Sequence, residues 1–329
     1  MKIVLSIPVH EQVSVIVDQV KNMLHFVPSG VIVLHANSDS LRDKLNRIFH
    51  TNERVFINPQ VEYSAWGEIV RCHLSNFEYM QSLLQFDYFV LHASNDMYIR
   101  FGVENYLVRY SAGYTKRVIS HPDTEWWPAA NAFSDPWLRN IMKNDGISLI
   151  VGTQVEGSFY RKELFSEIAK SIRKSIEQRQ DSPLNGGYTR EEFFFSTIAN
   201  HLVSSAETGL PFVYSEVHEY DRRFWKARRR LRKIYSFPTI NHLIPQNVYD
   251  FIEDKWMWES KKYGRYRLTV KQIRLLQQMN DSFLEGKKTI DDGDGPVRLY
   301  DQVENIFAVK RVPREYNHPI RKYLRKYIK

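Results

Sequence analysis

Short polar segments follow four apolar runs of this sequence, and their side chains suit the binding of a polar ligand. They are Pro8-Val9-His10, HANSDS (35–40), Asn58-Pro59-Gln60 and Ser94-Asn95-Asp96. These segments offer imidazole, amide, hydroxyl and carboxylate groups, which all form hydrogen bonds. If the apolar runs are parallel strands, the four segments meet at one edge of a sheet, where α/β proteins bind ligands. The pattern predicts one crevice of a nucleotide-binding α/β unit.

Several familiar chemistries are excluded because their motifs are missing. No GxGxxG follows the first apolar run, GKKT (286–289) lacks the earlier glycine of a P-loop, and neither HExxH nor GxSxG occurs. The single cysteine, Cys72, lies in a predicted helix, so we expect a buried structural thiol. It also rules out an internal disulfide and fits a reducing compartment. Asp292-Gly293-Asp294 is better interpreted as a flexible acidic turn than as a metal–diphosphate site.

Alternating strands and helices must position the polar segments. Four apolar runs predict buried strands: Ile3–Ile7, Val31–His35, Val55–Ile57 and Tyr88–Leu91. Apolar residues at helical spacing predict helices between these strands, over 13–24 and about 66–84, and further helices over 160–178 and 190–204. Unbroken apolar strands are typical of a mostly parallel sheet with helices on both faces. The predicted fold class is α/β.

The length and composition allow a large buried core. Of 329 residues, 43% are hydrophobic and 26% are charged, so long disorder is not expected. No apolar run approaches the roughly 18 residues of a membrane-spanning helix, and MKIVLSIPVHEQ lacks the features of a signal peptide. We expect a cytoplasmic protein with a first domain at 1–220 and a basic, mainly helical region at 221–329.

Basic charge is concentrated in two late stretches. The net charge is +8, and the excess lies in DRRFWKARRRLRK (221–233) and KRVPREYNHPIRKYLRKYIK (310–329). Cations interleaved with aromatic side chains suit peripheral contact with an anionic membrane face, at about 1 kcal/mol per cation. A solvated helix face is the alternative interpretation. Nucleic acid is not expected as a partner, because no recognised binding motif accompanies the charge.

Five sequence blocks occur in the order found in a known enzyme family. They are HAN (35–37), the segment 64–100 with Trp66-Gly67-Glu68 and Asp87-Tyr88-Phe89, VEGSFYRKELFSEI (155–168), TREEFFFSTIAN (189–200) and IFAVKRV (306–312). Together they resemble the core-2/I-branching glycosyltransferases, the family of β-1,6-N-acetylglucosaminyltransferases and peptide O-xylosyltransferases, in a prokaryotic-type form. Asn37 replaces the family's ribose-contacting aspartate, Gly157 replaces a tryptophan, and the proline after Asp96 and the Golgi anchor are missing. These departures bear on the donor sugar more than on the reaction class.

The resemblance implies a GT-A-type fold and an inverting, metal-independent glycosyltransferase without a cofactor. It would move N-acetylglucosamine, or as a second choice xylose, from a UDP donor to a glycan or lipid-linked acceptor in surface polysaccharide synthesis. By resemblance the general base is Glu192, with Glu191 as a lesser alternative. Lys310 would neutralise the departing diphosphate, assisted by one of the arginines 298, 311 and 314.

The remaining expected contacts divide between donor and acceptor. Donor-binding residues are expected in the first domain and in the basic region that follows it: Val9, Asn37, Asn58, Pro59, Gln60, Glu156, Gly157, Arg298 and Arg311. Acceptor-binding residues are expected at Asp96, Trp126 and Trp127, where Asp96 could instead cap a turn and the tryptophans could instead form an apolar plug. No residue is assigned to a metal.

Other interpretations of these residues and of the protein's function remain open at the level of the sequence. Glu191 and Glu192 could be first-turn helix acids that follow an N-cap at Thr189. A metal-dependent transferase could use Asp96 or the Asp292/Asp294 pair. A non-catalytic protein could use the basic tail to bind a membrane or nucleic acid.

Overall fold

A seven-stranded mixed sheet forms the centre of the molecule. The computed structural model describes residues 1–62, 64, 67–121, 128–178, 188–214 and 306–328, and parts of 218–278. The strand order is β10-β6-β9-β4-β1-β2-β3, in which β4, β1, β2 and β3 are mutually parallel. Only β9 runs antiparallel to its neighbours in this sheet. The α/β fold with a largely parallel sheet is confirmed.

Apart from β1 and β2, the strands of this sheet are short. Their bounds are β1 (Ile3–Val9), β2 (Gly30–Ala36), β3 (Val55–Ile57), β4 (Tyr88–Leu91), β6 (Ala112–Gly113), β9 (Phe159–Arg161) and β10 (Thr208–Gly209). The predicted bounds of β3 and β4 are confirmed, and β1 and β2 extend beyond the prediction.

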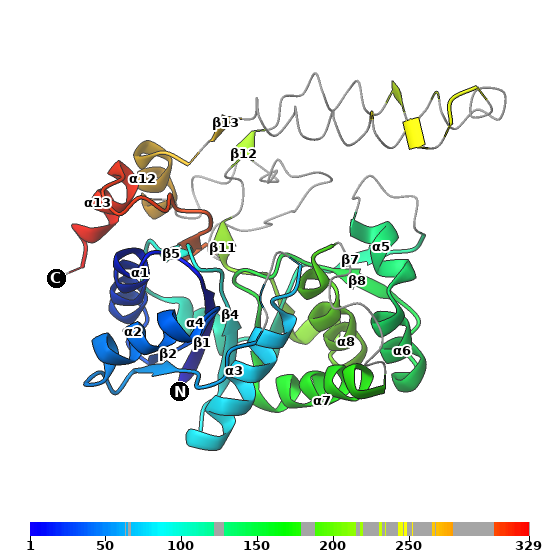
Figure 1. The fold of residues 1–329 in the computed structure, drawn as a ribbon, viewed down its shortest axis with the longest axis horizontal. Coiled ribbons are helices and arrows are strands. Elements are labelled where there is room, and N and C mark those ends of the chain that lie inside the picture. The colour runs from blue at the N-terminus through cyan, green and yellow to red at the C-terminus, as the bar shows by residue number, and fades with distance from the viewer. Residues whose placement is uncertain are drawn as a thin grey trace.

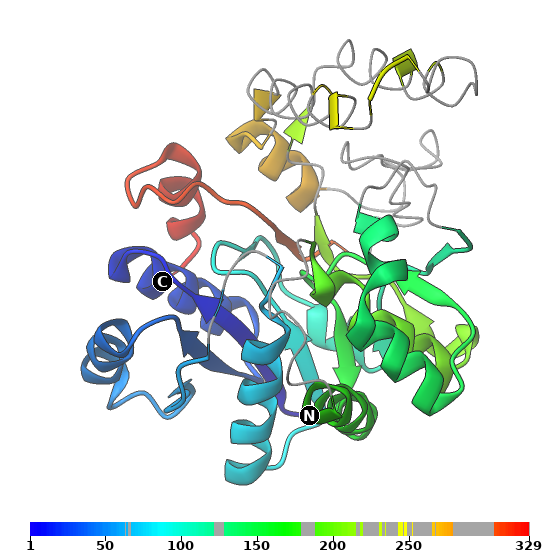
Figure 2. The same cartoon turned by 45° about the vertical axis from the view of Figure 1, so that its right-hand side comes forward.

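Helices cover both faces of the sheet because side chains of a strand alternate between its faces. On one face Leu5 of β1 packs in a cluster with Ile16 of α1 (Val13–Phe26). On the other face Val4 packs in a cluster with Phe77 of α3 (Val70–Leu83) and Phe165 of α7 (Lys162–Gln178). Figures 1 and 2 show the blue α1 and the cyan α3 on opposite sides of β1.

Further helices complete the two layers. They are α2 (Asp39–Phe49), α4 (Val103–Leu107), α5 (Pro128–Ser134), α6 (Pro136–Asp145), α8 (Phe194–Leu202), α12 (Val270–Gln278) and α13 (Pro319–Arg325), with 3₁₀ turns η1 (Arg190–Glu192) and η2 (Ser205–Glu207). Small sheets contain β5 (Met97–Tyr98), β7 (Arg117–Ile119), β8 (Ile150–Gly152), β11 (Val213–Tyr214), β12 (His218–Glu219), β13 (Arg265–Tyr266) and β14 (Ala308–Val309). The described helices include none that is long and apolar enough to cross a membrane.

Three predicted helices begin later than expected. The helix predicted over about 66–84 begins at Val70. The first residues of the predicted helix 160–178 belong to β9, because Phe159–Arg161 pairs with β4 and β6. The predicted helix 190–204 is a 3₁₀ turn, η1, followed by α8. Phe193 has a non-helical backbone between the two (φ −123°).

The C-terminal segment 306–328 packs on the first half of the chain. β14 pairs with β5 and β11, and α13 lies against α1, as the red segment in Figure 1 shows. The guanidinium of Arg321 is buried and donates to Asp18 of α1 at 2.8 Å. Arg321 and Lys310 are therefore buried, although the sequence predicts a basic surface for the stretch 310–329 that contains them. The expected boundary near 220 falls where the structure describes few residues.

Candidate functional site

An open pocket of about 790 Å³ lies at the carboxyl ends of the parallel strands. Its floor consists of residues that follow β1, β2 and β4, namely His10, Asn37 and Ala93–Asn95. Loops around 155–156, 189–192 and 311–314 close its sides. The volume is in the range of small-molecule sites. The predicted crevice is thus present, and the C-terminal segment forms one of its walls.

One wall of the pocket is basic and is organised by Glu11. Arg314 places its Nε 2.8 Å from Glu11 Oε1, and His10 Nε2 lies 3.2 Å from the same oxygen. Ser94 donates its hydroxyl to Glu11 at 2.7 Å. Arg311 lies beside this group on the pocket wall. The buried Glu11 carboxylate thus fixes polar groups from three segments at the rim.

Arg311 has an unusual backbone conformation. Its φ is +57°, the only positive value of a non-glycine residue in the part of the chain that the structure describes. Hydrogen bonds on either side impose it, from Lys310 N–H to Tyr214 O and from Val312 N–H to Asn95 O. A left-handed conformation costs about 1–2 kcal/mol for a residue with a Cβ. Glycine would avoid this cost, so the presence of an arginine indicates that its side chain has a role here.

Three glutamates, Glu156, Glu191 and Glu192, line the same pocket, and we refer to them as its acidic wall. The turn η1 presents the last two, and it is held by hydrogen bonds from Glu192 N–H to Thr189 O and from Thr153 N–H to Glu192 O. Thr189 was expected to cap a helix here, but its side chain makes no capping hydrogen bond. The two glutamates are therefore not first-turn acids of a capped α-helix.

Arg190 anchors the turn that carries the two glutamates. Its guanidinium is buried, with Nε 2.6 Å from Asp135 Oδ2 and NH1 2.7 Å from Glu68 Oε1. The ring of Trp137 lies 4.3 Å below the guanidinium carbon. Asp135 also accepts from the hydroxyl of Tyr188 and caps α6. The contacts of Arg190 with Asp135, Glu68 and Trp137 therefore hold η1 in position.

The carboxyl group of Glu191 is unusual among the groups of the pocket. Its residue is only 5% exposed, and its Oε2 has no hydrogen-bond partner among the described residues. Burial raises the pKa of Glu191 well above its ordinary value, and the charges of Glu192, Glu156 and Glu68 raise it further. Its surroundings therefore favour the protonated, neutral form of this carboxyl group.

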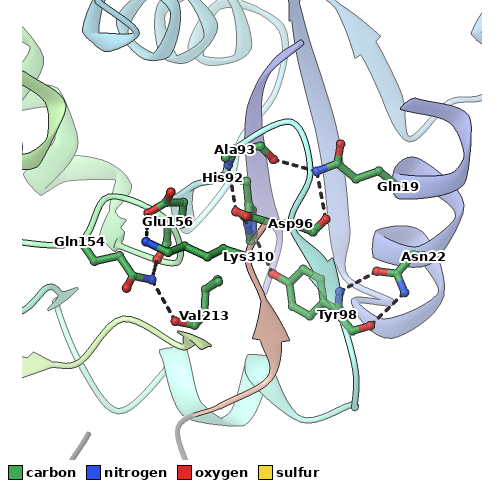
Figure 3. Close-up of polar contacts among 10 residues, drawn as sticks. All are labelled: Gln19, Asn22, His92, Ala93, Asp96, Tyr98, Gln154, Glu156, Val213 and Lys310. Carbon is green, nitrogen blue, oxygen red and sulfur yellow. Dashed lines mark hydrogen bonds and ion pairs between the residues drawn. The ribbon is translucent and has the colours of Figure 1, made fainter. Parts of the chain in front are cut away.

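Lys310 lies behind the acidic wall and does not line the pocket. Its Nζ is 3.8 Å from Glu156 Oε2, and its side chain is 2% exposed (Figure 3). Gly157, the next residue after Glu156, has φ +78°, and a Cβ there would lie 2.6 Å from Val213 Cγ2. Only glycine lets this loop pass so close to β11. The expected contact of Lys310 with a diphosphate stays a prediction.

Asp96 belongs to a buried chain of hydrogen bonds beside Lys310. Its Oδ2 accepts from Ala93 N–H at 2.9 Å and lies 3.2 Å from His92 Nδ1, while His92 Nε2 lies 3.0 Å from the Tyr98 hydroxyl (Figure 3). Burial raises the pKa of Asp96, and the His92 contact lowers it. Asp96 thus caps its own turn, one of its two expected roles. No group of three metal-ligating side chains occurs in the described ranges.

The expected site residues fall into three groups. Asn37, Glu156, Glu192 and Arg311 line the pocket together. Asn58-Pro59-Gln60 does not, because the Asn58 amide is buried and donates to Ser75 and Asn76 of α3. Val9 is buried at the end of β1. Gly157, Lys310 and Asp96 do not line the pocket either. Six residues lie outside the described ones: Trp66, Trp126, Trp127, Arg298, Asp292 and Asp294.

The sequence did not single out Glu11, Arg190 or Asp135 as site residues. Glu11 directly follows the strand-end segment 8–10, and this adjacency was a usable signal. Arg190 precedes the two glutamates, but its partners lie 55 and 122 residues away in the chain. Nothing in the local sequence indicates those pairs.

Comparisons with known proteins do not assign the chain to a family. No protein-family model matches it, and no curated protein matches it either. A function must therefore be proposed from the pocket and from the sequence resemblance.

Proposed function

We propose that this protein is an inverting glycosyltransferase of the GT-A type that takes its sugar from a UDP donor. The observation that carries the proposal is that one pocket is lined both by cations, Arg311 and Arg314, and by carboxyl groups, Glu191 and Glu192. A nucleotide-sugar needs both kinds of surface, because its diphosphate is anionic and the attacking hydroxyl must lose a proton. The donor sugar is N-acetylglucosamine or xylose, and the acceptor is a glycan or a lipid-linked sugar.

In the proposed reaction the acceptor hydroxyl attacks the anomeric carbon from the face opposite the diphosphate. Its proton passes to the Glu192 carboxylate, while the new C–O bond forms and the bond to the diphosphate oxygen breaks. UDP leaves with the electron pair of the broken bond. Fixed cations such as Arg311 can stabilise the charge that develops on the diphosphate. No metal is needed for this step, in keeping with the family that the sequence resembles.

Glu192 suits the role of base better than its neighbour. A base must be ionised before it accepts a proton, whereas burial and neighbouring carboxyl groups favour the protonated form of Glu191. Glu192 is partly exposed and lines the pocket, and its backbone is fixed by the hydrogen bond from Thr153. Fixed geometry at the reacting atoms is what a general base requires.

Removal of the Arg311 side chain tests the donor site. In both Arg311→Ala and Arg311→Gly the affinity for UDP is expected to fall about 10- to 100-fold, as for the loss of a charged hydrogen bond worth about 1.5–3 kcal/mol. Glycine relieves the backbone strain, so Arg311→Gly should unfold at higher urea than Arg311→Ala. Titration calorimetry and urea unfolding measure the two effects.

The matched control is Arg139→Ala, which removes an exposed arginine of α6 far along the chain from the pocket residues. It should bind UDP as the wild type does. Equal UDP affinity in the wild type and both Arg311 variants would show that the basic wall does not hold the diphosphate.

A further inference from the structure

Glu191 is a buried carboxyl group with an unused oxygen in the wall of a ligand pocket. A buried polar atom without a hydrogen-bond partner costs about 1–3 kcal/mol. No described residue pairs with Glu191 Oε2. Glu191 is at the same time one of the residues that line the pocket. A bound molecule is therefore the natural partner of this oxygen.

The groups around Glu191 determine whether it can be a donor. Glu192 follows it on η1, Glu156 lines the same pocket, and Glu68, just before α3, is close enough for its charge to act on Glu191. The nearby thiol of Cys72 on α3 is buried, and its pKa is raised to about 12, so it stays neutral. Arg190, the adjacent cation, is engaged by Glu68 and Asp135. The described surroundings of Glu191 are thus dominated by negative charge.

We propose that Glu191 keeps its proton at neutral pH and donates a hydrogen bond from Oε2 to an uncharged oxygen of the donor or acceptor sugar. The sugar contact rests on the proposed function, whereas the protonation of Glu191 does not. Two adjacent glutamates then have different roles, with Glu191 as a neutral donor and Glu192 as the ionised base. Burial separates neighbouring carboxyl groups in this way in other enzyme sites.

The inference restricts the class of sugar that the acidic wall receives. Three carboxyl groups would first suggest a cationic ligand such as a free amino sugar. A protonated Glu191 instead needs an acceptor, and an ammonium group has none. Hydroxyl and carbonyl oxygens are acceptors, so the wall suits a neutral sugar, including one with an acetamido group.

The protonation of Glu191 is tested without any ligand, by infrared spectroscopy at pH 7. We expect the wild type to show a C=O stretch of a protonated carboxylic acid that is absent from Glu191→Gln. Glu177→Gln, which changes an exposed glutamate of α7, should keep this band. The deciding quantity is the difference between the wild-type and Glu191→Gln spectra, because Asp96 is also a buried carboxyl group. A wild-type minus Glu191→Gln difference spectrum without this band would overturn the inference.

The sugar contact is tested by the affinities for UDP, UDP-N-acetylglucosamine and UDP-xylose. Glutamine also presents a neutral donor, so Glu191→Gln should bind each ligand within about threefold of the wild type. Glu191→Leu should bind UDP normally but lose about 3- to 10-fold in affinity for the preferred UDP-sugar, as for one neutral hydrogen bond.

Two outcomes of this binding experiment would overturn the sugar contact. If Glu191→Gln loses as much UDP-sugar affinity as Glu191→Leu, an ionised carboxylate is required instead of a donor. If the wild type binds none of the three ligands, the sugar contact and the proposed function fail together. The infrared spectrum then still decides the protonation of Glu191 alone.

Discussion

Replacement of Glu192 by glutamine is expected to lower the turnover of the UDP-sugar by about 10²–10⁴-fold, the usual contribution of a positioned general base. Glutamine preserves the size of the side chain but cannot take the proton of the acceptor hydroxyl. The backbone bond from Thr153 N–H to Glu192 O is unaffected, so η1 should keep its geometry. UDP affinity should therefore stay within about twofold of the wild type. Initial rates of UDP release and titration calorimetry measure the two quantities.

The control for this variant is Glu177→Gln, because Glu177 is an exposed glutamate of α7 that does not line the pocket. Its turnover should equal that of the wild type. A Glu192→Gln enzyme with normal turnover would rule out Glu192 as the base. If Glu191→Gln abolished turnover instead, the roles of the two glutamates would be reversed.

Replacement of Arg190 by methionine is expected to destabilise the protein by about 3–5 kcal/mol, the typical cost of removing one partner of a buried ion pair. Methionine fills part of the volume but leaves the carboxylates of Glu68 and Asp135 buried without their cation. The contact with the Trp137 ring is lost as well. Because η1 is anchored by this network, turnover should fall even where the variant remains folded. Urea unfolding gives the change in the free energy of unfolding.

Arg173→Met provides the comparison for a surface pair. Arg173 and Glu78 form a bidentate contact at 2.7 and 2.9 Å, but both side chains are partly exposed. Such a pair contributes about 0–1 kcal/mol. If Arg190→Met cost no more than Arg173→Met, the buried network would not be what holds η1 in place.

The strands of the parallel half could be predicted because they are short, unbroken apolar runs. Val55–Ile57 and Tyr88–Leu91 have the predicted bounds. β1 continues through Pro8 to Val9, beyond the predicted end. Its pairing with β4 stops at Ser6, so at Pro8 only β2 is a neighbour and the missing N–H is tolerated. The predicted strand Ile3–Ile7 therefore ends two residues before β1 does.

The pairings that complete the site are non-local and leave no local signal. Phe159–Arg161 looks like the start of a helix, but it is inserted between β4 and β6 as an antiparallel strand. Phe193 separates η1 from α8 because its ring is buried in the core beside Tyr188. The strand-end rule placed Asn37 in the pocket, but it could not exclude Asn58, whose amide is used inside the protein. Tertiary contacts decide these positions.

The most direct test of the proposed function is UDP release from a panel of UDP-sugars, with simple sugar acceptors and with or without EDTA. We expect release from UDP-N-acetylglucosamine or UDP-xylose that resists EDTA, and a product whose anomeric configuration is inverted, as followed by proton NMR. Release that EDTA abolishes would contradict a diphosphate site built from Arg311 and its basic neighbours. No release from any UDP-sugar would contradict the proposed glycosyltransferase activity itself.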